Sequence, residues 1–133
     1  MIAVDTNVLV RYAVKDDRKQ AALATVFLAG NRCFVLKTAL LELAWVLSSP
    51  AGYDLPRETV HERLLHILGL PDIEMEDAVN VAQALSWYAE GMDFADALHL
   101  AGSSELAGLV TFDRKFTAIA EKLDAVPFVR LVR

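Results

Sequence analysis

Four carboxylate residues stand in apolar surroundings, where they could do chemistry together. Asp5 follows Ile-Ala-Val and Asp113 follows Leu-Val-Thr-Phe, so each lies at the carboxyl end of an expected strand. Glu42 and Asp96 lie within apolar stretches of helical spacing. A buried charge is costly unless it is paired or holds a metal ion, so each acid needs an explanation. If the four converge on one pocket, they need a cation, because like charges raise one another's pKa.

Oxygen donors restrict the identity of that cation. An all-carboxylate site suits Mg²⁺ or Mn²⁺, whereas zinc prefers histidine and cysteine ligands. Such an ion can activate a water molecule and stabilise the charge that develops on a phosphoryl group. Part of the formal net charge of -5 would then belong to the pocket. An acidic chain therefore does not exclude a nucleic-acid partner, since a bound metal reverses the local sign.

Asp5, Asp96 and Asp113 also have a structural interpretation, as does the nearby Asp93. Asp5 can form a turn or a helix cap, and Asp113 can cap a helix that begins at the next residue. Asp93 shares a helical face with Asp96 and is a good N-cap. Asp96 would then lie in the first turn, where a carboxylate favours the helix dipole. We interpret Asp96 as functional, and Asp93 as a cap that supports it.

Glu42 is harder to explain structurally. It lies in a stretch over residues 39–47 that is apolar all round, so we expect this helix and Glu42 to be buried. Thr38 is a plausible N-cap for this helix. A capping box with Thr38 would need the acid at residue 41, which is leucine. A salt bridge to an arginine is the remaining structural alternative.

The elements that must position these acids alternate between strands and helices. Alternation of this kind predicts an α/β fold with a parallel sheet covered on both faces. A chain of 133 residues without a linker or repeat predicts a single domain over residues 1–133. The predicted strands are 2–4, 33–36, 72–75, 109–111 and 127–132, and the predicted helices are 20–29, 39–47, 57–68, 77–89, 93–106 and 114–123.

Composition excludes several classes of protein. An apolar fraction of 55% is too high for a disordered chain, and no apolar run is long enough for a membrane span. A single cysteine, Cys33, excludes a disulfide framework and suits a reducing compartment. No basic leader follows Met1, so we expect a cytoplasmic protein with no membrane partner.

The ordered set of motifs resembles a PIN domain and, more narrowly, the VapC toxins of bacterial and archaeal toxin–antitoxin pairs. The resemblance covers essentially the whole chain. Its specificity lies in the order of the motifs, because a lone Asp-Thr-Asn would be weak. The motifs are Met-Ile-Ala-Val-Asp-Thr-Asn-Val-Leu at 1–9, Glu42, Asp-Phe-Ala-Asp-Ala-Leu-His-Leu-Ala at 93–101 and Val-Thr-Phe-Asp-Arg-Lys-Phe at 110–116.

This resemblance implies a three-layer α/β/α fold with a short, mainly parallel central sheet flanked by helices. It also implies an endoribonuclease toxin that hydrolyses RNA phosphodiester bonds with a metal-activated water, with Mg²⁺ or Mn²⁺ as cofactor. The implied partners are the RNA substrate, a small inhibitory antitoxin of the VapB type and a second copy in a homodimer. The implied catalytic and metal-binding residues are Asp5, Glu42, Asp96 and Asp113, and the implied supporting residues are Thr6, Asn7, Asp93 and Thr111.

A few further residues have an expected place. Arg114 is the best candidate for an RNA contact, although a solvated surface is the default for such a side chain. His99 could extend the face of Asp96, but a helix-face or core histidine is the simpler interpretation. Trp45 and Trp87 lie in apolar helices, which favours core packing over base stacking.

Three alternative functions fit the sequence less well. A phosphatase of the haloacid dehalogenase type needs a second aspartate two residues after the first, and that position is Asn7. A metal-free ribonuclease would use histidine and lysine, but the three histidines are scattered. A non-catalytic acidic module that binds a basic partner stays open.

Overall fold

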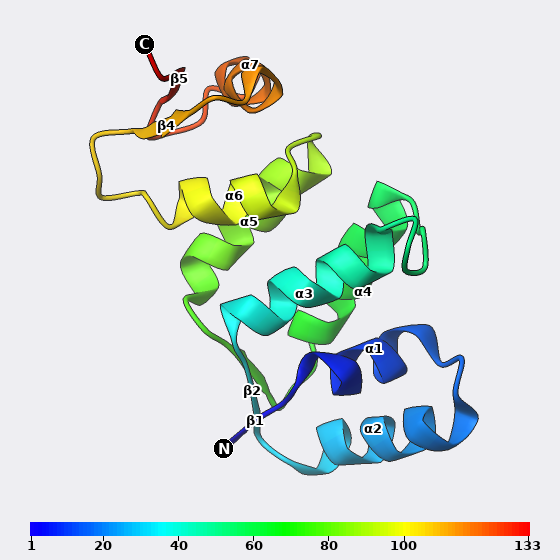
Figure 1. Cartoon of the computed structure of the whole chain (residues 1–133). Coiled ribbons are helices and arrows are strands. Elements are labelled where there is room, and N and C mark those ends of the chain that lie inside the picture. The colour runs from blue at the N-terminus through cyan, green and yellow to red at the C-terminus, as the bar shows by residue number, and fades with distance from the viewer. The chain divides into compact units, whose positions relative to one another are not determined.

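The computed structural model describes all 133 residues. Along the chain, single strands are separated by one or two helices (Figure 1). Seven helices and five strands confirm the predicted α/β class, and every strand pair is parallel. The chain divides into two compact units, Met1–Ala78 and Val79–Arg133, and each is described by itself. The single domain expected over residues 1–133 stays a prediction.

Unit 1 contains a three-stranded parallel sheet of order β1-β2-β3. Parallel strands need crossover connections, which two pairs of helices supply. Ile2 lies opposite Cys33, and Phe34 lies opposite Glu74. The elements of unit 1 are β1 (Ile2–Ala3), α1 (Thr6–Val14), α2 (Arg18–Gly30), β2 (Cys33–Val35), α3 (Lys37–Ser48), α4 (Arg57–Leu68) and β3 (Ile73–Met75).

The core of unit 1 lies among its helices. Helix α1 packs against α2 and α3, and α3 packs against α4 (Figure 1). Leu9 of α1, Leu40 and Leu43 of α3, and Val60 and Leu64 of α4 are completely buried. Burying such side chains contributes about 1.5–3 kcal/mol each before the entropic cost of folding is subtracted. Because α1 follows β1 directly and packs against α3, this packing holds the carboxyl end of β1 in a fixed position relative to α3.

Unit 2 contains a parallel pair of strands and three helices. Helix α7 packs on both strands, with Phe116 and Ala120 buried. The Tyr88 and Phe94 rings meet edge to face with centroids 5.5 Å apart. The elements that follow unit 1 are α5 (Ala78–Ala89), α6 (Phe94–Ala101), β4 (Leu109–Thr111), α7 (Arg114–Lys122) and β5 (Val129–Leu131).

Helix α1 covers residues 6–14, for which the sequence pattern predicts no element. The run Val8-Leu9-Val10 conceals the helical period, although Leu9, Val10 and Ala13 line one buried side. The helix predicted over 93–106 is also too long, because α6 ends at Ala101 before Gly102. Glycine favours a helix end on entropic grounds.

Helix α3 differs from its prediction in two ways. It begins at Lys37 without a side-chain cap from its N-cap residue, so Thr38 is not the N-cap. Instead, Glu76 Oε1 accepts a hydrogen bond of 2.8 Å from the Lys37 backbone N–H. The helix is not buried all round, because Glu42 is exposed and Trp45 has 61% of its surface exposed. The predictions of a buried Glu42 and a core Trp45 are therefore wrong.

None of the seven helices combines the length and apolarity that crossing a membrane requires.

Candidate functional site

Asp5 and Glu42 contact the same residue, Thr6. Asp5 follows β1 and is the N-cap of α1, where its Oδ1 accepts a hydrogen bond of 2.8 Å from the Thr6 backbone N–H. The Thr6 hydroxyl donates to Glu42 Oε1 at 2.5 Å. Thr6 is buried, with 8% of its surface exposed, whereas both carboxylate residues are exposed. Thr6 thus joins the first turn of α1 to the middle of α3.

This contact explains Glu42 in physical terms. A buried hydroxyl needs a hydrogen-bond partner, and a carboxylate is a strong one. The partner of Glu42 is therefore a hydroxyl, and the sequence alternatives of a capping box and an arginine pair do not describe it. One carboxylate oxygen is held in place, and an exposed carboxylate keeps further acceptor positions for a ligand.

Asp5 also borders a cavity of about 490 Å³ between α1 and α2. Asn7 shares that border and is exposed, and the walls include Val8, Leu23 and Phe27. The cavity is thus mainly apolar, with a carboxylate and an amide at one part of its lining.

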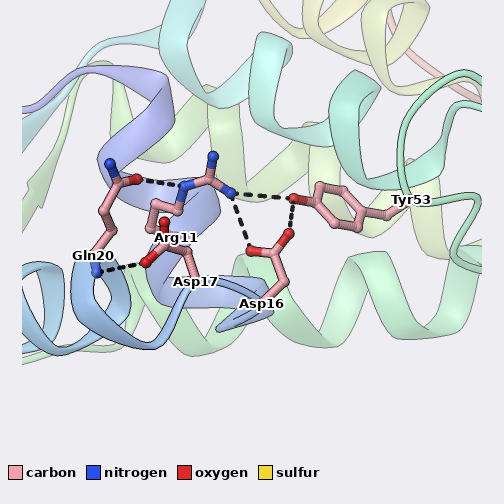
Figure 2. A network of polar contacts seen from close by, with 5 residues as sticks. All are labelled: Arg11, Asp16, Asp17, Gln20 and Tyr53. Carbon is pink, nitrogen blue, oxygen red and sulfur yellow. Dashed lines mark hydrogen bonds and ion pairs between the residues drawn. The ribbon is translucent and has the colours of Figure 1, made fainter.

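Arg11 and Gln20 line the same cavity and belong to a polar network that Figure 2 shows. The Arg11 guanidinium lies 3.0 Å from Asp16 Oδ1, and its Nε donates to Gln20 at 2.7 Å. The Tyr53 hydroxyl donates to Asp16 Oδ2 at 2.7 Å. This hydrogen bond, with the Arg11 charge, lowers the pKa of the Asp16 carboxyl. No local sequence pattern indicates this network, because Tyr53 lies in a loop 37 residues after Asp16.

In unit 2, Asp93 and Asp113 both cap helices, as their structural interpretation predicts. Asp93 is the N-cap of α6, and its Oδ2 accepts from the Asp96 backbone N–H at 3.1 Å. Asp113 follows β4 and caps α7 by accepting from the Lys115 and Phe116 backbone N–H groups. Thr111 Oγ1 accepts from the Asp113 backbone N–H at 3.0 Å. Capping occupies one oxygen and does not prevent a carboxylate from binding a cation.

Asp96 lies in the first turn of α6 and is half-buried. Burial raises the pKa of its carboxyl, and the negative charges of Asp93 and Asp113 raise it further. His99 acts in the opposite direction, toward a lower pKa. The carboxylates of Asp93, Asp96 and Asp113 therefore interact electrostatically, and the interaction disfavours the ionised form of Asp96.

The chemistry of these donors fits a divalent metal ion. Carboxylate oxygens are the preferred ligands of Mg²⁺ and Mn²⁺. A cation would offset both the burial and the negative charges that raise the pKa of Asp96. As the structure stands, no three His, Cys, Asp or Glu side chains are grouped so that they could hold a metal ion.

The remaining predicted residues lie on the surface or in the core. Arg114 is exposed at the first position of α7, and His99 is exposed on α6. Trp87 is buried, with 8% of its surface exposed, which confirms its core interpretation. Phe112, next to Asp113, has 84% of its surface exposed, and the sequence analysis gave it no role.

Comparison with known proteins identifies one family. The model of the PIN domain matches residues 2–122. A comparison with curated proteins finds no match. PIN domains are in general nucleases that need metal ions and act on RNA. The helices and parallel strands are consistent with the fold of this family. Because the match covers nearly the whole sequence, the chain belongs to the PIN domain family.

Proposed function

We propose that the chain is an endoribonuclease toxin of the VapC type, which hydrolyses RNA phosphodiester bonds with the help of Mg²⁺ or Mn²⁺. The observation that carries the proposal is the PIN-domain match over residues 2–122, a range that includes Asp5, Glu42, Asp96 and Asp113. Burial and the negative charges of Asp93 and Asp113 raise the pKa of the Asp96 carboxyl, and in a family of metal-dependent nucleases such a carboxylate has a direct use as a metal ligand.

The proposed metal-binding and catalytic residues are Asp5 and Glu42 in unit 1, and Asp96 and Asp113 in unit 2. When bound, a divalent ion supplies Lewis-acid stabilisation of the charge that develops on the phosphoryl oxygens. The chain's own supporting residues orient the carboxylates. The Thr6 hydroxyl donates a hydrogen bond to Glu42, and the Asp93 carboxylate accepts one from the Asp96 backbone in the first turn of α6.

Asn7, Thr111 and Arg114 have supporting roles in the proposal. Thr111 holds the backbone of Asp113 and so fixes the turn that carries its carboxylate. Asn7 is exposed on the cavity that Asp5 borders, where its amide can orient substrate. Arg114 is exposed one residue after Asp113, which suits a contact with the RNA backbone.

The proposed partners are a small antitoxin of the VapB type and a second copy of the chain. The apolar cavity between α1 and α2 supports the first, because an apolar segment of an inhibitor that lay there would reach Asp5. Exposed Val26 and Trp45 supply apolar surface for a homodimer. A cytoplasmic location completes the proposal, and the single buried cysteine suits it.

The decisive experiment incubates the antitoxin-free protein with total cellular RNA and Mg²⁺ or Mn²⁺. We expect discrete fragments that disappear in EDTA and with Asp96→Asn. Asp124→Asn is the matched control, because Asp124 is an exposed residue of the same unit whose left-handed backbone asparagine also tolerates. Asp124→Asn should cleave like the wild type.

Two results would contradict the proposal. Cleavage that persists in EDTA and in Asp96→Asn would show that these carboxylates are not the catalytic group. Intact RNA with folded wild-type protein that binds Mn²⁺ would favour the acidic docking module. Circular dichroism of each variant establishes that it is folded.

A further inference from the structure

A second cavity of unit 1 combines an aromatic pair with cationic side chains. It measures about 270 Å³ and lies between α1 and α4. The Tyr12 and His66 rings are stacked, with centroids 5.7 Å apart and planes 11° from parallel. The Tyr12 hydroxyl lies 2.8 Å from His66 Nε2, so a hydrogen bond fixes the two rings together. We call this cavity the Tyr12 pocket.

Two cations border the Tyr12 pocket. Lys15 Nζ lies 4.2 Å from the centroid of the Tyr12 ring and donates a long hydrogen bond of 3.5 Å to Thr25 Oγ1. Arg63 donates a hydrogen bond to the Ala13 carbonyl. Both cationic side chains are exposed, and the two ion pairs of unit 1 join other residues, Arg11 with Asp16 and Lys37 with Asp77. Glu62 is the one acidic residue in the lining. The pocket thus has two positive charges against one negative charge.

Lys15 also lines a neighbouring cavity, whose wall is mainly apolar. That cavity measures about 420 Å³ and is lined by Lys15, Arg18 and side chains of α2. Lys15 lines both cavities, whereas Arg18 borders only the neighbouring one and Arg63 only the Tyr12 pocket.

The backbone at Lys15 is unusual for a lysine. Lys15 ends α1 with a left-handed φ of 59°, a position that glycine occupies most easily. The other non-glycine residues with positive φ are Asp54, Asp77 and Asp124. Aspartate tolerates that conformation, whereas a lysine adopts it at a cost. The chain therefore keeps a long cationic side chain where its backbone would favour glycine.

We propose that the Tyr12 pocket binds a single strand of RNA outside the catalytic carboxylates. Lys15 and Arg63 bind phosphate groups, and a base stacks on the exposed ring of His66. This inference rests on the proposed function, because it concerns the same RNA substrate. Helix α1 begins next to Asp5, and Tyr12 lies seven residues further, about 10 Å along the helix axis. A strand that is cleaved near Asp5 could therefore reach the pocket within a few nucleotides.

The test measures the fluorescence anisotropy of a labelled oligouridylate in EDTA, where binding is separated from cleavage. Lys15→Gln and Arg63→Gln should each reduce the slope of log K against log salt by about 0.7, the value for one phosphate contact on a single strand. His66→Ala should weaken binding about tenfold, as the loss of one stacked base does. Lys122→Gln on α7 is the matched control and should leave the slope unchanged.

Lys15→Gly separates binding from folding. Glycine relieves the left-handed backbone, so the melting temperature should stay the same or rise while the affinity for oligouridylate falls. A lysine that served only the fold would give the opposite stability result.

Unchanged salt slopes in Lys15→Gln and Arg63→Gln would overturn the inference. A second result would also overturn it: uridine monophosphate binds the wild type in a manner that needs Lys15, whereas oligouridylate binds equally well with and without Lys15. The pocket would then serve a free nucleotide. Failure of the proposed function looks different. In that case the wild type binds oligouridylate through Lys15 but cleaves no RNA with Mn²⁺. If it cleaves RNA and the variants leave affinity and KM unchanged, only the inference about the Tyr12 pocket is wrong.

Discussion

The Thr6 hydroxyl donates a hydrogen bond of 2.5 Å to Glu42 Oε1 across 36 residues of sequence. Asp5 accepts from the backbone of the same threonine. One small polar residue therefore fixes two carboxylates that come from different elements. A serine or threonine is suited to this role because its backbone and side chain donate in different directions.

Thr6→Val tests this role with little change in side-chain shape. We expect the free energy of unfolding to fall by about 1–2 kcal/mol, because the buried Thr6 position loses a hydrogen bond to the charged Glu42 carboxylate. RNA cleavage should fall as well, since Glu42 loses the group that orients it. Urea denaturation measures the first effect.

Thr25→Val is the matched control for that experiment. The hydroxyl of the exposed Thr25 donates to the Ala21 carbonyl within α2 and accepts a long contact of 3.5 Å from Lys15 Nζ. A local bond and an exposed contact of this kind add little to stability. Equal losses of stability in the two variants would show that the Thr6–Glu42 contact is not special.

Gly52→Ala should destabilise unit 1 strongly. A Cβ at Gly52 would lie 2.1 Å from the Val46 carbonyl oxygen, and backbone atoms cannot move aside as the end of a flexible side chain can. The expected loss is at least about 2 kcal/mol, in the range of other overpacking substitutions. Gly30→Ala is the control, because a Cβ there meets nothing within 4 Å. Its stability by urea denaturation should be equal to or above that of the wild type.

Much of the fold could be predicted from local patterns. The helix over Arg57–Leu68 has its predicted ends, because Pro56 precedes it and Gly69 follows it. Caps were also readable, since Asp93 and Asp113 stand directly before their helices. These signals act over a few residues, which is the distance that a pattern in one sequence can resolve.

Contacts between distant segments could not be predicted in the same way. Glu76 supports the start of α3 from a position after β3, so the sequence alone favoured Thr38 as the cap. Trp45 is exposed because only one side of α3 is buried. A helix that is apolar all round gives no sequence signal for which side that will be. The acid motifs indicated the candidate residues, whereas the hydroxyl that holds Glu42 depends on how α1 and α3 pack.

The Arg11–Asp16–Tyr53 network predicts a stability change in acid. The folded state lowers the pKa of Asp16 from its ordinary value of 3.8, so its contribution is fully present above that pH. As the pH falls through the lower folded pKa, Asp16 is protonated and the contribution is lost. Melting temperatures of wild type and Asp16→Asn should therefore differ at neutral pH and approach each other in acid. A difference that grows in acid would contradict this assignment.

We expect the ionised Asp96 carboxylate to lower the stability of the metal-free protein and to contribute to metal binding. Its folded pKa is raised, so ionisation of Asp96 opposes folding once the pH exceeds the ordinary pKa of 3.8. In EDTA at neutral pH, Asp96→Asn should therefore melt at a higher temperature than the wild type. Added Mn²⁺ should raise the melting temperature of the wild type and have less effect on the variant, because a ligand stabilises only the state that binds it. An Asp96→Asn variant that is less stable in EDTA and responds fully to Mn²⁺ would show that Asp96 serves the fold rather than the metal.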